Sequence, residues 1–136
     1  MTNKADLEQF IKKNLKDRAF IITSNREPFL HVKTPEGVRL MQSAGGAHTL
    51  LDSIARASHG TYVAHAGGDG DSETVDEHGR IKVPPGEESY TLRRVFLSKK
   101  EVDKYYYGFA NQTLWPLCHA VFVKPIFDES WWEYYK

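Results

Sequence analysis

An arginine and a pair of glycines stand where this sequence could hold an anion. Arg26 follows a short apolar run, and Gly45 and Gly46 directly precede residues with helical spacing. The free N–H groups at a helix N-terminus favour an anion, glycine lets the backbone approach a phosphate, and arginine pairs with phosphate through two N–H groups. The pattern fits a phosphate site, although a plain Gly-Gly turn and a surface arginine explain the same residues.

A second candidate is the aromatic segment 105–116, in which three consecutive tyrosines precede Trp115. Tyrosine O–H and tryptophan N–H groups can bind phosphate oxygens or sugar hydroxyls while the rings pack on apolar surface. Core packing is the alternative, because Tyr106 lies on the apolar stripe of its predicted helix. Three consecutive tyrosines cannot all face one core, so we expect at least one of them to reach solvent or a ligand.

Acidic residues and histidines gather in the middle of the chain. The set comprises His65, Asp69, Asp71, Glu73, Asp76 and His78. A calcium loop of the EF-hand type starting at Asp69 needs glycine where Thr74 stands and glutamate where Arg80 stands, and no histidine pair has the spacing of a zinc-binding helix. We therefore interpret the segment as a solvated acidic turn and predict no metal and no cofactor.

Alternating strands and helices must position these residues. The apolar runs predict strands at 19–23, 61–65, 80–83 and 90–97, with a hairpin of 29–33 and 38–42 after the first strand. Helical spacing predicts helices at 5–15 and 47–57, a capped helix after Ser98, a helical or kinked segment at 111–119, and a last helix from Asp128 through Tyr135. We expect Leu50, Leu51 and Ile54 to share the buried face of the second helix.

A strand, a glycine-containing loop, a helix and a second strand begin an α/β layered domain. In open α/β sheets, ligands bind beyond the carboxyl ends of the strands, which is where Arg26 falls. A length of 136 residues suits a single domain, so we expect residues 1–136 to form one.

The composition excludes several classes of protein. Lysine plus arginine and aspartate plus glutamate number 18 each, so the balance of charge gives no case for nucleic acid or an anionic membrane. No apolar run is long enough to span a bilayer, the first 17 residues lack a signal-peptide pattern, and one cysteine excludes an internal disulfide. We predict a cytoplasmic protein in which Cys118 is a small buried hydrophobe rather than a nucleophile.

Several of these pieces together resemble the trehalose-6-phosphate synthase family. Arg26 after an apolar strand and Gly45-Gly46 before a helix are similar to that family's N-terminal loop. A more specific stretch follows, with Tyr105-Tyr106, Phe109, Asn111 and Leu114-Trp115-Pro116-Leu117-Cys118-His119, continuing through Pro125, Phe127 and Trp131-Trp132. The resemblance covers 20–136, nearly the whole chain.

The resemblance implies the Rossmann-like N-terminal half of a two-domain GT-B-type glycosyltransferase, with a β-hairpin insertion after the first strand. Such enzymes transfer glucose from a nucleotide sugar, commonly UDP-glucose, to glucose-6-phosphate with retention and without a metal. Arg26, Tyr106, Trp115 and His65 would bind the acceptor, glucose-6-phosphate, and Gly45 and Gly46 would lie against the donor diphosphate.

Three departures from the family pattern stand out. Ala64-His65-Ala66-Gly67 occupies the place of the usual Gly-Trp-Ser-Gly, and Ala47-His48 replaces the usual leucine and small residue. The family's later catalytic loop and its second, nucleotide-binding domain have no counterpart here. The resemblance therefore implies no catalytic residue within this chain and an inactive chain on its own: a fragment, a truncated reading frame or one piece of a split enzyme, meeting the missing domain in trans or self-associating.

Two other hypotheses stay open at this point. The chain would be a non-catalytic phosphosugar-binding or regulatory module, or an interaction protein that uses its aromatic C-terminal third. The first alternative shares the sugar-phosphate site with the enzyme hypothesis, whereas the second predicts a protein partner and no effect of sugar phosphates.

Overall fold

The computed structural model describes residues 4–16, 18–119 and 122–136, and the chain divides into two separately packed units, 1–96 and 97–136. Unit 1 contains, in chain order, α1 (Lys4–Leu15), β1 (Ile21–Arg26), β2 (Phe29–Thr34), β3 (Gly37–Gln42), α2 (Gly46–Ser58), β4 (Thr61–His65), the 3₁₀ turn η1 (Asp71–Glu73), β5 (Arg80–Val83) and β6 (Tyr90–Val95). Unit 2 contains α3 (Lys99–Glu101), the π-helix η2 (Val102–Leu114), α4 (Trp115–His119) and α5 (Glu129–Tyr135). Among the described residues, no helix is long and apolar enough to cross a membrane.

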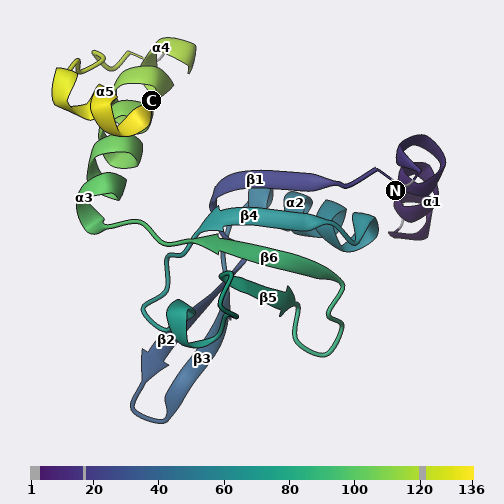
Figure 1. The fold of residues 1–136 in the computed structure, drawn as a ribbon. Helices are drawn as coiled ribbons and strands as arrows, with labels where there is room; N and C mark the ends of the chain where they lie inside the picture. Colours follow the sequence, from purple (N-terminus) through teal and green to yellow (C-terminus); the bar gives the residue numbers. More distant parts are fainter. Residues whose placement is uncertain (1–3, 17, 120–121) are drawn as a thin grey trace. The chain divides into compact units, whose positions relative to one another are not determined.

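Unit 1 is built on a four-stranded sheet in the order β1-β4-β6-β5 (Figure 1). Strands β1, β4 and β6 are parallel, and β5 pairs antiparallel with β6. Helix α2 connects β1 to β4 and lies on one face of the sheet (Figure 1). Because β1 and β4 are parallel, the crossover helix must run back along them, so the N-terminus of α2 faces the carboxyl edge of the sheet.

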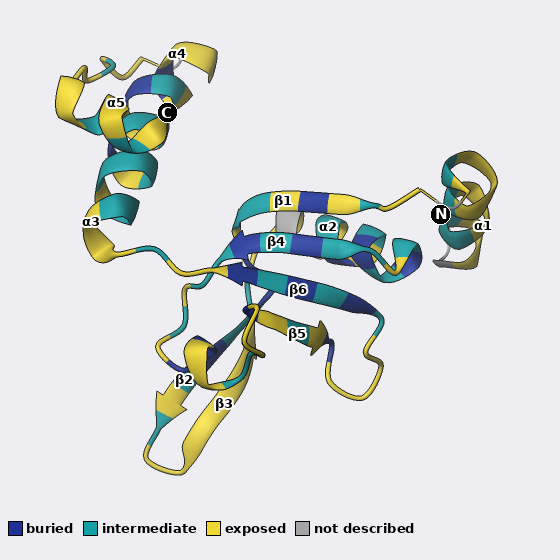
Figure 2. Ribbon diagram, in the orientation of Figure 1, coloured by how far each residue is buried: buried dark blue, intermediate teal, exposed yellow. Residues whose placement is uncertain are grey.

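The core of unit 1 lies between the sheet and α2. Tyr62, Ala64, Tyr90 and Leu92 are buried on this face of β4 and β6. Strand β3, which belongs to the separate hairpin, is exposed throughout (Figure 2). Because side chains alternate along a strand, Thr61 and Thr91 belong to the other face. Full burial of each large apolar side chain contributes about 1.5–3 kcal/mol.

Two expectations about this core are wrong in detail. Leu51 and Ile54 pack against the core, but Leu50 is 63% exposed, because at 100° per residue it lies about a quarter turn from the centre of the buried stripe. The first strand begins at Ile21 rather than at residue 19, and it forms an edge of the sheet in which Ile22 is buried while Ile21 is exposed.

A hairpin of β2 and β3 follows β1 as a separate two-stranded sheet. Its turn is closed by Gly37 with φ 120°, a conformation that other residues rarely adopt. Phe29 and His31 on β2 are buried, while β3 is exposed along its length. Strand β2 therefore packs within unit 1, whereas β3 does not.

The first and the last helix of unit 2 each begin with the N-terminal cap that the sequence predicts. Ser98 and Glu101 form a reciprocal capping box at α3, and the Asp128 carboxylate accepts the Ser130 N–H at the start of α5. The rings of Trp132 and Tyr135 pack on Phe109, with centroid distances of 5.3 and 4.7 Å.

The helix between these caps is a π-helix of 13 residues, where helical spacing predicts an ordinary helix. Pro116 follows it and has no N–H, and the Gln112 carbonyl, four residues earlier, accepts instead from the Ile126 N–H at 2.9 Å. A side chain at Gly108 would meet the Trp131 ring at 2.7 Å, so α5 packs directly against the π-helical backbone. These contacts come from segments distant in sequence, which local periodicity does not register.

Candidate functional site

The carboxyl edge of the parallel sheet brings two of the predicted site residues together. Arg26 ends β1 and His65 ends β4, and the two are register partners in the parallel ladder, just past a bulge that follows Ser24. The Arg26 side chain is exposed, and its carbonyl accepts from the Tyr62 hydroxyl at 3.5 Å. A guanidinium and an imidazole thus start from adjacent backbone positions at the edge where ligands bind in open α/β sheets.

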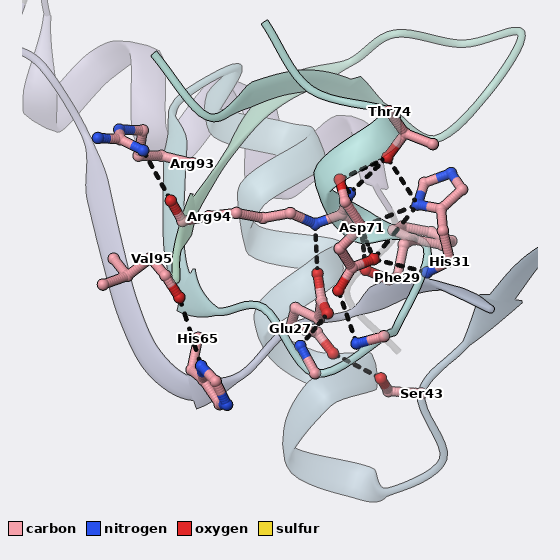
Figure 3. Close-up of polar contacts among 12 residues, drawn as sticks. Glu27, Phe29, His31, Ser43, His65, Asp71, Thr74, Arg93, Arg94 and Val95 are labelled. Atoms are coloured by element: carbon pink, nitrogen blue, oxygen red, sulfur yellow. Dashed lines mark hydrogen bonds and ion pairs between the residues drawn. The ribbon is translucent and has the colours of Figure 1, made fainter. Parts of the chain in front are cut away.

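The His65 ring is oriented by the third parallel strand. Its Nδ1 lies 3.3 Å from the carbonyl oxygen of Val95 at the end of β6, a contact drawn in Figure 3. A carbonyl oxygen can only accept, so Nδ1 carries the proton in this bond. In the neutral ring, Nε2 is then an acceptor suited to a sugar hydroxyl.

The N-terminus of α2 begins with the glycine pair. Gly45 has φ 138° and ψ 141°, a conformation that favours glycine, and no side chain caps the helix. A Cβ added at Gly46 would meet nothing within 4 Å, so the backbone there is open to an approaching group. The helix begins at Gly46, one residue before the predicted start; the side chains of Ala47 and His48 are outside those that the structure describes. An uncapped start of this kind suits an anion.

A buried ion cluster, which the sequence interpretation missed, lies beneath this edge. Arg94 on β6 is fully buried, and its Nε donates to Glu27 at 2.7 Å. On its other side the guanidinium lies 2.8 Å from an Asp71 carboxylate oxygen and 2.9 Å from Nδ1 of His31 (Figure 3). Further hydrogen bonds join it to the Thr74 hydroxyl at 2.8 Å and to the Phe29 carbonyl at 3.1 Å.

The interpretation of the acidic segment as a solvated turn is wrong for Asp71. Its side chain is fully buried and accepts the N–H groups of His31 and Gly68, each at 2.7 Å. The positive charge of Arg94 and these two donors compensate the loss of hydration. Asp76, in contrast, is partly exposed and holds the loop before β5 through Arg80. Within the described part of the chain, no three His, Cys, Asp or Glu residues form a metal-binding group.

The cluster contains two carboxyl groups and one guanidinium, and burial therefore favours a proton on one carboxyl. Burial, together with the neighbouring Asp71, raises the pKa of the Glu27 carboxyl to about 7, although Gly67 and Arg94 oppose the shift. Burial and the charge of Arg94 lower the pKa of His31 below its ordinary value of 6.5. Nδ1 of His31 faces an Arg94 N–H, which agrees with a neutral ring that accepts at this atom.

One sequence signal could have revealed this cluster. In β6, Tyr90, Leu92 and Arg94 share the buried face, because they alternate with Thr91 and Arg93. An arginine in the inward register of a buried strand needs a buried acid as its partner. The sequence alone does not identify that partner, because Glu27 and Asp71 are 67 and 23 residues away.

Tyr106 and Trp115, the other predicted acceptor-binding residues, belong to unit 2. The backbone N–H of Trp115 donates to the Ala110 carbonyl five residues earlier, which is the hydrogen bond of a π-helix. An ordinary helix would separate Tyr106 from Trp115 by about two and a half turns, on opposite sides. With between four and five residues per turn, a π-helix separates them by about two turns, so by this count they project from the same side.

Trp115 is accessible at the surface of unit 2, and the residues that follow Pro116 in α4 are exposed as well. The tryptophan is 48% exposed and its ring stacks on His119 at a centroid distance of 4.6 Å, while Tyr106 packs between Tyr105 and Tyr107. Cys118 is exposed, so its prediction as a buried hydrophobe is wrong. Helix α4 is short and buries only one of its sides. Pro116 lies on that side, which leaves Cys118 exposed.

Sequence comparisons find relatives that match most of the chain. The family model described as glycosyltransferase family 20 matches residues 18–136. A trehalose-6-phosphate synthase of Mycolicibacterium gilvum is 39% identical over 117 residues, which are 85% of this chain and 23% of that protein. A trehalose-6-phosphate synthase of Mycobacterium leprae is 39% identical over 124 residues, or 90% of this chain and 24% of that protein. The chain thus spans under a quarter of the length of these relatives.

Solved structures share the fold. A structure described as trehalose-6-phosphate from E. coli bound with UDP-2-fluoro glucose is 25% identical, with a TM-score of 0.52 over 87% of this chain and 22% of that one. An α,α-trehalose-phosphate synthase (UDP-forming) from Burkholderia vietnamiensis has the same TM-score at 24% identity, covering 87% and 21% of the two chains. The expected α/β fold with a parallel sheet, similar to part of the GT-B fold of these proteins, is confirmed.

Proposed function

The chain belongs to glycosyltransferase family 20, and from this premise we propose that it forms the acceptor side of a trehalose-6-phosphate synthase-like enzyme. The proposed reaction moves glucose from a nucleotide sugar, UDP-glucose first, to glucose-6-phosphate. The observation that carries the proposal is the pairing of Arg26 with His65 at the carboxyl edge of the parallel sheet, the edge that α2 also faces with its glycine-led N-terminus.

Each proposed contact follows from the chemistry of its side chain. The exposed Arg26 guanidinium binds the acceptor phosphate through paired N–H groups. Nε2 of His65 accepts from a sugar hydroxyl, and Tyr106 and Trp115 contribute ring surface and polar hydrogens. Gly45 and Gly46 lie against the donor diphosphate, with the backbone open at Gly46.

The transfer needs no metal, because the charge that develops on the diphosphate can be stabilised by fixed N–H donors and basic side chains. Phe127 and Trp132 are exposed large rings in unit 2, and we propose that a further protein surface covers them. That surface is either the rest of a family 20 enzyme or a second copy of the chain.

A binding titration tests the phosphate contact. Isothermal titration of the chain with glucose-6-phosphate should give saturable binding, and Arg26→Ala should weaken it roughly ten- to a hundredfold, the loss of 1.5–3 kcal/mol of charge-assisted hydrogen bonding. Arg39→Ala is the matched control, because Arg39 is another exposed arginine in the same unit but lies on β3.

The outcomes separate the candidate functions. Equal affinity of Arg26→Ala and the unchanged chain would contradict the phosphate site. Binding by the chain, with no glucosyl transfer after the remaining length of a family 20 relative is supplied, would instead favour a non-catalytic phosphosugar-binding module. Absence of any sugar-phosphate effect would favour an interaction protein.

A further inference from the structure

Glu27 joins the ends of all three parallel strands. It directly follows Arg26 at the end of β1, yet its side chain is only 2% exposed. Its Oε1 accepts the N–H of Gly67, two residues beyond the end of β4, at 2.8 Å. Its Oε2 accepts from Nε of Arg94 near the end of β6, at 2.7 Å. One carboxyl group thus bridges the ends of β1, β4 and β6, and Figure 3 shows its bond to Arg94.

The Arg94 guanidinium, to which Glu27 is bonded, is itself held in place. The remaining N–H groups of Arg94 contact Asp71, His31, Thr74 and the Phe29 carbonyl, so the guanidinium has little freedom to follow a displaced Glu27. The next residue, Val95, supplies the carbonyl that orients the His65 ring. The Glu27 carboxyl is therefore linked to both candidate ligand-binding residues through the chain: Arg26 directly precedes Glu27, and His65 contacts the carbonyl of the residue that follows Arg94.

The position of the buried ion cluster indicates a role in site geometry as well as in stability. The core between the sheet and α2 is apolar, with Tyr62, Tyr90 and Leu92 fully buried. A buried ion pair is weak evidence for stability, because apolar residues of similar volume often stabilise as much, but it fixes geometry more narrowly. Here the charged groups gather beneath the strand ends, where geometry determines ligand binding.

We propose that Glu27 is a positioning residue for the acceptor site: its carboxyl group, bonded to the Gly67 N–H and to Arg94, fixes the position of Arg26 relative to His65. Glu27 does not itself touch the ligand. For the identity of the ligand this inference rests on the proposed function, and the tests below separate the failure of one from the failure of the other.

The first test compares Glu27→Gln with Asp52→Asn in the full chain. Glutamine keeps the shape but must turn an NH₂ group toward one of the two donors, so one bond to Glu27 is lost. Asp52 is also a buried carboxylate with two partners, Tyr90 and Arg56, but it lies on α2. We expect glucose-6-phosphate affinity to fall about tenfold in Glu27→Gln, because small displacements of binding groups are costly. Asp52→Asn should stay within about twofold.

A double-mutant cycle distinguishes positioning from a general loss of structure. If Glu27 acts through Arg26, then Glu27→Gln should have little further effect on affinity in an Arg26→Ala background. Additive losses in the cycle, or wild-type affinity in Glu27→Gln, would overturn the proposal.

Two further measurements test the proposal if Glu27→Gln folds poorly or if glucose-6-phosphate does not bind. The first compares two substitutions of Gly67. Gly67→Pro removes the N–H donor and leaves the Glu27–Arg94 pair intact, whereas Gly67→Ala keeps the N–H and places a Cβ 3.8 Å from Glu27 Oε1. Only the proline variant should lose affinity; equal affinities would overturn the proposal.

Residual dipolar couplings of the ligand-free chain report the relative orientation of the Arg26 and His65 amides. These should change in Glu27→Gln, or in Gly67→Pro, and not in the matched controls. If the unchanged chain does not bind glucose-6-phosphate, the proposed function fails while these couplings still decide the positioning role. Unchanged couplings would overturn that role.

Discussion

At the scale of single residues, the buried charges under the sheet edge are the main feature that the sequence does not reveal. Arg94 joins Glu27 and Asp71, which come from distant parts of the chain. The sequence predicts Arg26, His65 and the glycine pair as site residues from their places at strand and helix ends, and the structure puts Arg26 beside His65. The sequence does not predict the burial of Asp71, because that burial depends on Arg94, which lies 23 residues further along the chain.

Replacing Arg94 should be far more damaging than replacing its neighbour Arg93. Arg94→Met leaves two buried carboxyl groups without a counter-charge, which should lower the free energy of unfolding by about 3–5 kcal/mol. Arg93 is partly exposed on the other face and donates to the Arg94 carbonyl, so Arg93→Met should cost under about 1.5 kcal/mol. Urea unfolding measures both, and similar losses would contradict the assigned burial.

The pH dependence of stability should carry a contribution from Glu27. Its pKa rises from 4.5 to about 7 on folding, so the folded chain binds the proton more tightly. This contribution to stability is fully present below pH 4.5 and is lost as the pH rises through about 7. The lowered pKa of His31 acts in the opposite sense, since its contribution is present above pH 6.5 and is lost as the pH falls.

The Glu27 contribution is isolated by comparison with Glu27→Gln, in which residue 27 does not titrate. The unfolding free energy of the unchanged chain minus that of the variant should decrease between pH 4.5 and 7. A difference that is constant, or that increases over this interval, would show that the Glu27 pKa is not raised.

At the scale of secondary-structure elements, agreement was best where a local signal acts alone. β4 and β5 have the predicted bounds, and the caps at Ser98 and Asp128 form as their residue types indicate. The π-helix was not predictable, because Val102, Tyr105, Tyr106 and Phe109 fit ordinary helical spacing and the wider turn depends on contacts with Trp131 and Ile126.

Removing one residue from the π-helix tests its role in placing Tyr106 and Trp115. Deletion of Asn111, an exposed residue, should shift the helix by one residue and rotate Trp115 by about 80° relative to Tyr106. We expect glucose-6-phosphate affinity to fall about tenfold. Asn111→Ala, which leaves the register intact, should bind normally; equal binding by the deletion variant would contradict the shared face.

At the scale of the whole molecule, the family assignment and the coverage of the relatives lead to one expectation about activity. The chain spans under a quarter of the length of the synthases it matches. Transfer of glucose requires positioned groups around both the acceptor and the leaving diphosphate. We predict that the 136-residue chain binds glucose-6-phosphate but releases no UDP from UDP-glucose in its presence, and sustained UDP release in a coupled assay would contradict this division.

Intermolecular NOEs between glucose-6-phosphate and the labelled chain at saturation test the proposed acceptor site most directly. We predict NOEs from one bound sugar phosphate to the His65 ring and to the Arg26 side chain, which lie at the ends of adjacent strands. NOEs confined to other residues, or NOEs to His65 that persist unchanged in Arg26→Ala at the same ligand concentration, would contradict this site.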